Sequence, residues 1–184
     1  MSRRFRSLGW VVTGLIAGGG CATTRPAVDD AASRRMLSLL MPSRIEIVKP
    51  FTRVESFDGD DVPDGIELLL QAVNALDNPG LMIVGTVRAE LYEFVPASGD
   101  RKGRQVDHWT IELTTESSQR RFWNRLTQMY EFRLGVDVSA ITAADRYVLA
   151  VTYTSPLGDH FADEYVIARG RTAGTGARGA IGNH

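Results

Sequence analysis

The chain has 184 residues, of which 43% are hydrophobic and 23% charged. These values fit one globular domain and exclude a wholly disordered or collagen-like protein. The formal net charge is −1, whereas a dedicated nucleic-acid-binding protein carries a basic surplus, so no nucleic-acid partner is expected. The single cysteine, Cys21, excludes an intramolecular disulfide and a multi-cysteine metal site.

The first 20 residues have the three parts of a secretory signal peptide. A basic start is followed by an apolar run from Leu8 to Ala17 and then by three glycines. The run is about half the roughly 20 apolar residues that a permanent membrane span needs. We therefore expect residues 1–20 to be removed on export. The basic start consists of Arg3, Arg4 and Arg6.

The small residues directly before Cys21 resemble the lipobox of bacterial lipoproteins. This resemblance implies that a diacylglycerol is attached to the sulfur of Cys21, that the chain is cleaved before it, and that the mature protein is held on a membrane of the bacterial cell envelope, outside the cytoplasm. The alternative is an ordinary secretory signal cut near Ala22, which would release a free protein.

Polar or glycine-rich segments flank the predicted domain. Residues 21–35 are small, polar and charged after Cys21, and we expect a flexible, lipid-anchored tether. Residues 170–184 are rich in glycine and are expected to be a disordered tail. The domain then covers residues 36–169. An apolar cluster from Met36 to Leu40 opens it, and we expect one helical turn, or a plug, that packs under the domain.

Alternation of apolar and polar residues dominates between these limits and predicts seven or eight β-strands separated by turn signals. Such a pattern is typical of an all-β, antiparallel β-sandwich. The expected strands are Ile45–Val48, Phe51–Val54, Ile66–Val73, Val84–Val95, Val106–Thr114, Tyr130–Leu134, Tyr147–Tyr153 and Phe161–Ala168.

One segment interrupts the alternation. Residues 119–130 place Phe122, Leu126 and Tyr130 at i, i+4 and i+8, which predicts a short amphipathic helix that crosses from one sheet to the other. The arginines around Phe122 and Trp123 could instead form a nucleic-acid surface. We disfavour that interpretation because large apolar residues at helical spacing usually belong to the core.

Residues 141–153, ITAADRYVLAVTY, resemble the part of immunoglobulin-like domains in which an Asp-containing bend precedes a corner tyrosine. The resemblance assigns Tyr147 as that tyrosine and Leu149 as the buried position two residues later. With the anchor signal, the chain resembles uncharacterised bacterial lipoproteins that carry a single immunoglobulin-like β-sandwich. This resemblance implies a fold and a location but no activity.

An aspartate-rich segment, FDGDDVPDG over residues 57–65, is a candidate calcium site. Carboxylates on a Gly-bent loop can supply several of the six to eight oxygens that calcium takes. The segment is similar to the loops of thrombospondin type 3 repeats, but it occurs only once. The alternative is a solvated acidic turn without metal. The candidate ligands are Asp58, Asp60, Asp61 and Asp64.

Catalytic motifs are weak. Asp107-His108 and Asp159-His160 could form a triad with Ser155 or Ser117, but no nucleophile-elbow motif accompanies them. We therefore expect a non-enzymatic module that binds an envelope protein or glycan, or supports structure, through residues 96–105 or an exposed sheet edge.

A carbohydrate-binding module or hydrolase with a site built from distant strands is the alternative. A cleft with convergent acids and an exposed Trp109 or Trp123 would favour it. Burial of both tryptophans in a smooth sandwich would favour the non-enzymatic module.

Overall fold

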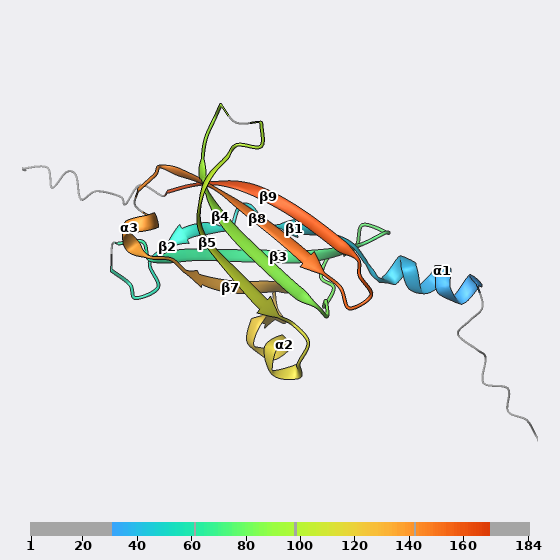
Figure 1. Cartoon of the computed structure of the whole chain (residues 1–184). Helices are drawn as coiled ribbons and strands as arrows, with labels where there is room; N and C mark the ends of the chain where they lie inside the picture. The colour runs from blue at the N-terminus through green and yellow to red at the C-terminus, as the bar shows by residue number, and fades with distance from the viewer. Residues whose placement is uncertain (1–30, 61, 98, 142, 170–184) are drawn as a thin grey trace, which may run out of the picture.

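The computed structural model describes residues 31–60, 62–97, 99–141 and 143–169, and they form two antiparallel sheets that pack face to face (Figure 1). The all-β sandwich predicted from the sequence is confirmed. One sheet has the order β1-β3-β7-β6, with β2 also paired to β3, and the other has the order β5-β4-β8-β9. The first consists of β1 (Pro42–Ile47), β2 (Arg53–Glu55), β3 (Gly65–Asn74), β6 (Trp123–Asn124) and β7 (Met129–Gly135), and the second of β4 (Thr86–Phe94), β5 (Lys102–Glu112), β8 (Arg146–Thr154) and β9 (His160–Ala168).

The strand order is immunoglobulin-like. β1-β3-β7-β6 corresponds to strands A-B-E-D, and β5-β4-β8-β9 corresponds to C′-C-F-G. The tyrosine assigned from the sequence lies at the start of β8, after the short helix α3 (Val138–Ile141). The Tyr147 hydroxyl donates to the Ala140 carbonyl and accepts from the Ala144 amide, both at 3.0 Å. Tyr147 and Leu149 are fully buried, so the predicted tyrosine corner is present.

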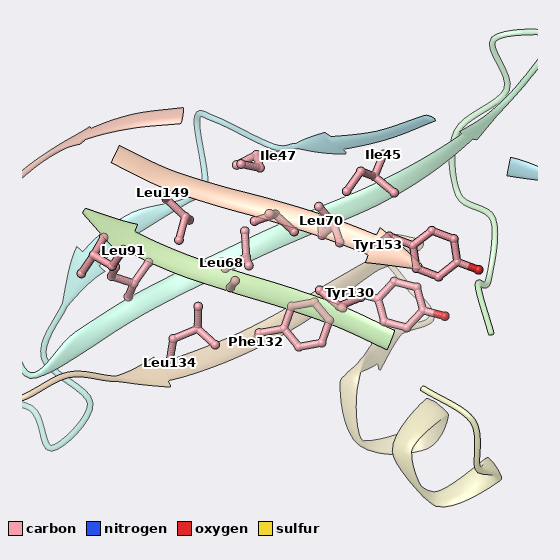
Figure 2. Packing of buried hydrophobic residues seen from close by; sticks show 14 of the residues in the cluster. Ile45, Ile47, Leu68, Leu70, Leu91, Tyr130, Phe132, Leu134, Leu149 and Tyr153 are labelled. Carbon is pink, nitrogen blue, oxygen red and sulfur yellow. The ribbon is translucent and has the colours of Figure 1, made fainter. Parts of the chain in front are cut away.

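The core lies between the sheets and is built from alternate residues of each strand (Figure 2). Leu68 of β3 pairs with Phe132 of β7, and Leu91 of β4 pairs with Leu149 of β8. All four side chains are buried and point into the same space. A slip of one residue in either pairing would turn these side chains toward solvent, so the alternation fixes the register.

The predicted helix over residues 119–130 is wrong in its extent. Helix α2 covers only Glu116–Phe122, with Thr115 as its N-cap. The chain then forms β6, a turn and β7. The Asn124 side-chain oxygen accepts from the amides of Leu126 and Thr127, and such an Asx turn competes with continuation of the helix. Leu126, predicted to be part of the buried stripe, is 95% exposed.

The apolar cluster at the start of the domain is helical, as predicted, but does not pack under the sandwich. It belongs to helix α1 (Ala31–Leu40), which begins within the predicted tether and has no buried residue. α1 leads into β1 and extends away from the sheets (Figure 1), so its apolar side chains gain no core contacts. Among the described residues, no helix is both long and apolar enough to cross a membrane.

Several predictions concern residues that the structure does not describe. The signal peptide (1–20), the lipid attachment at Cys21, the first part of the tether and the tail (170–184) lie outside the described residues.

Candidate functional site

The aspartates of the candidate calcium loop mainly hold the loop itself together. The Ser56 hydroxyl donates to Asp58 and Asp60 carboxylate oxygens at 2.9 and 3.2 Å. Asp58 also accepts from the Asp60 amide, and Asp60 accepts from the Val62 amide. The Asp60 amide is the main cause of the lowered pKa of Asp58, with the Ser56 hydroxyl second. These bonds are Asx turns, which aspartate forms without any metal.

Asp64, another candidate ligand, also serves the loop itself. An Asp64 carboxylate oxygen accepts from the Phe57 amide at 2.8 Å and so closes the loop before β3, whereas Asp61 lies outside the described residues. In the part of the chain that the structure describes, no three His, Cys, Asp or Glu side chains are grouped so that they could hold a metal ion. Calcium binding therefore stays a prediction.

Ser155, Asp159 and His160 do not assemble as a catalytic triad would require. Ser155 is buried, and its hydroxyl donates to an Asp159 carboxylate oxygen at 3.0 Å. The same hydroxyl accepts from the amides of Leu157 and Asp159, so it organises the β8–β9 turn. The His160 Nδ1 atom lies 3.0 Å from the Thr154 hydroxyl instead.

A groove of about 520 Å³ lies beside α2, β6 and β7. We call it the α2–β7 groove. Its polar and aromatic lining comes from the end of α2, from β6 and the turn after it, and from outward positions of β3 and β7. These residues are Glu67, Arg121, Phe122, Trp123, Asn124, Arg125, Glu131 and Arg133, and Phe132 of the core also borders the groove.

The groove exists because β6 is only two residues long. β6 pairs with β7 through Trp123–Tyr130 and Asn124–Met129, whereas β7 continues to Gly135 and pairs with β3 along its other edge. The second half of β7 therefore presents a sheet edge that β6 does not cover. Such an edge offers backbone donors and acceptors to an extended partner.

Two carboxylates of the groove already have partners. Glu67 forms an ion pair with Arg53 at 3.0 Å, and Glu131 accepts from the Asn124 side-chain amide at 2.7 Å. Burial is the main cause of the raised pKa of Glu67, and the neighbouring Glu55 adds to it while Arg53 opposes it.

Trp123 gives the groove its aromatic wall. Its ring packs edge-on against Tyr130, with centroids 4.9 Å apart, and the side chain is half-buried. It also borders a second hollow of about 500 Å³ that Met82, Gln119 and Arg120 line. Trp109 is half-buried too, and its ring nitrogen donates to the Gly135 carbonyl at 3.1 Å. Neither tryptophan is fully enclosed.

Sequence reasoning found part of this groove and missed the rest. The sequence indicates the arginines and aromatic residues of QRRFWNR as a possible surface. It does not indicate Glu67, Glu131 and Arg133, because outward charges on strands are common and only the pairing of β3 with β7 brings them together.

Comparisons with known proteins add little. No protein-family model matches the sequence, and no curated protein gives a significant match. Wild-type OgpA from Akkermansia muciniphila is structurally similar with 12% identity and a TM-score of 0.37, over 76% of this chain and 36% of that one. Catalytically inactive OgpA in complex with the O-glycopeptide glycodrosocin gives 12% identity and a TM-score of 0.38, over 74% and 35%. The chain spans about a third of the length of OgpA, and similarity at this level carries no argument about function.

The calcium prediction can be tested by calorimetric titration of the purified protein. If the loop binds calcium, the titration should release or absorb heat and give a dissociation constant of about 0.1–1 mM, the range of extracellular calcium modules. Asp64→Asn serves as a test variant because it alters one candidate ligand. A silent trace for the unaltered protein at millimolar calcium would rule the site out.

Proposed function

We propose that this chain is a non-enzymatic, lipid-anchored protein of the bacterial cell envelope, whose β-sandwich binds an extended partner through the α2–β7 groove. The observation that carries the proposal is the part of the β7 edge, between Tyr130 and Gly135, that β6 leaves unpaired beside an open groove. An added strand can pair with backbone groups there, while side chains on both sides determine which partner fits.

The chemistry of the groove favours recognition. Trp123 offers a rigid aromatic surface, and tryptophan and arginine are the residues that most often dominate binding energy at interfaces. Arg121 lies over the Phe122 ring at 5.0 Å and Arg133 over the Phe57 ring at 5.7 Å. Both arginines line the groove, and these contacts restrain their guanidinium groups. A partner with carboxylate or other acceptor groups therefore complements the rim.

The proposed anchor follows from the sequence around Cys21. Two or three acyl chains bind a membrane firmly, since each buried methylene contributes about 0.8 kcal/mol. A protein held in this way meets its partners at the membrane, where even weak binding by a single groove is favoured by high local concentration.

A carbohydrate-binding module or a hydrolase is the second candidate. It is supported by the presence of Trp123 together with two acids, Glu67 and Glu131, on one groove wall. Glycan-binding sites and glycosidases both use such residues. We rank it second because the Arg53 ion pair and the Asn124 hydrogen bond already engage these two carboxylates.

The anchor is tested by metabolic labelling with a palmitate analogue. We expect label on the full chain expressed in a bacterial host and none on Cys21→Ala, because the sulfur is the only proposed site of acylation. Equal labelling of the two proteins would refute the anchor.

The binding groove is tested by quantitative pull-down from the native envelope with the full chain, Arg125→Glu and Arg101→Glu. Arg125 lines the groove, whereas Arg101 lies in the β4–β5 loop at the other end of the sandwich. Arg125→Glu reverses one charge of the groove and should reduce the amount of captured partner about tenfold, since such a change costs about 1–2 kcal/mol of binding free energy. Arg101→Glu should capture as much partner as the unaltered chain.

Two results would redirect this proposal. Loss of capture with Arg101→Glu alone would place binding on the β4–β5 loop. Capture that survives protease treatment of the envelope but is lost after its glycans are oxidised would favour the carbohydrate-binding alternative.

A further inference from the structure

Helix α1 is amphipathic and its apolar face is uncovered. At 100° per residue, Met36, Leu37 and Leu40 fall on one side, whereas Arg34 and Arg35 fall on the other, where Leu39 also lies. Met36 is 69% exposed and Leu40 is 58% exposed. A ten-residue helix with this pattern gains little stability alone, so a surface that covers the apolar face would stabilise it.

The end of the sandwich next to α1 carries further exposed leucines. The pairing of Pro42 with Asn74 places the start of β1 beside the end of β3. The turn between β8 and β9 lies at the same end, as Figure 1 shows. The turn between β6 and β7 is at this end too, because Gly80 of the β3–β4 loop adjoins Gln128. The leucines on these three connections are Leu76, Leu126 and Leu157, and their exposed fractions are 54%, 95% and 79%.

These three leucines are presented in the same way. Each has its amide held by a side-chain oxygen two residues earlier. The Leu76 amide donates to the Asn74 side chain at 2.9 Å, the Leu126 amide to the Asn124 side chain at 2.8 Å, and the Leu157 amide to the Ser155 hydroxyl at 3.2 Å. Such turns hold the backbone of each tip in place, so all three leucines are fixed outward at one end of the domain.

We infer that this end of the sandwich, formed by α1 and the tips at Leu76, Leu126 and Leu157, rests on the surface of a lipid bilayer. The inference deepens the proposed function and rests on its anchor. Nine residues lie between Cys21 and Ala31, and even a fully extended chain over these ten residue-to-residue steps spans roughly 35 Å. A lipid on Cys21 would therefore keep α1 close to the bilayer.

The chemistry of this end matches a membrane interface. Separate leucine tips and one apolar helix face can each enter the boundary between headgroups and acyl chains, and the arginines on the opposite face of α1 can remain among the headgroups. A second copy of the chain would need a continuous complementary surface, which isolated tips do not provide. On a bilayer, the sandwich would stand with its aspartate-rich loop directed away from the membrane.

The test uses the full chain, processed in a bacterial host and reconstituted into phosphatidylcholine vesicles that contain phosphatidylglycerol. Leu157→Cys and Val62→Cys are each labelled with a fluorescent dye. Both positions are exposed, but Val62 lies in the loop at the opposite end. Spin-labelled lipids should quench the dye at position 157 several-fold more than the dye at position 62. Adding Leu37→Glu and Leu40→Glu, at exposed positions of α1, should remove most of this difference.

The outcomes separate the inference from the anchor. Retention on vesicles with equal quenching at both positions would overturn the membrane-facing end and leave the anchor intact. Dye that reacts with Cys21 would show that its sulfur carries no lipid. If the protein is also released from the vesicles, both the anchor and the membrane-facing end would be contradicted. Dye fluorescence at position 157 could instead change with protein concentration and not with spin-labelled lipid. That result would overturn the inference and indicate that a second copy of the chain covers this end.

Discussion

The buried phenol of Tyr130 ties together two connections that cross between the sheets, the one from β3 to β4 and the one from β5 through α2 to β6. The Tyr130 hydroxyl accepts from the Ile83 amide at 2.9 Å and donates to the Gln119 side-chain oxygen at 2.7 Å. The Gln119 side-chain nitrogen in turn donates to the Ile83 and Leu113 carbonyls. Burial raises the pKa of Tyr130, so the phenol remains a hydrogen-bond donor at physiological pH. Loss of such a buried partner costs about 1–3 kcal/mol.

This network determines where the candidate site lies. It fixes α2 against the β3–β4 connection, and Trp123 then follows α2 directly and packs on the Tyr130 ring. β6 therefore consists only of Trp123 and Asn124, where the turn begins, and it leaves most of the β7 edge without a paired strand. The β3–β4 connection also carries Leu76, and the turn that follows β6 carries Leu126. The groove and the proposed membrane-facing end thus depend on one arrangement of buried polar groups.

The sequence was sufficient for the sandwich and for its tyrosine corner, because alternation and turn residues act locally. It was not sufficient for α2. Phe122, Leu126 and Tyr130 suit a helix. In the structure Phe122 is half-buried at the end of α2, Tyr130 is buried in β7, and Leu126 occupies the turn between β6 and β7. The local Asx turn at Asn124 and the tertiary hydrogen bonds of Tyr130 decided that outcome. The groove could not be predicted, since it requires the register of β3 against β7.

Hydrogen exchange of Tyr130→Phe, compared with the unaltered chain and with Tyr165→Phe, tests the role of this phenol most directly. Removing the hydroxyl should speed exchange about tenfold or more at the Ile83 amide and at amides of α2, since 1.4 kcal/mol corresponds to a factor of ten. Amides of β8 and β9 should keep their protection, and Tyr165→Phe should change neither region. Unchanged exchange at Ile83 and α2 in Tyr130→Phe would contradict the account.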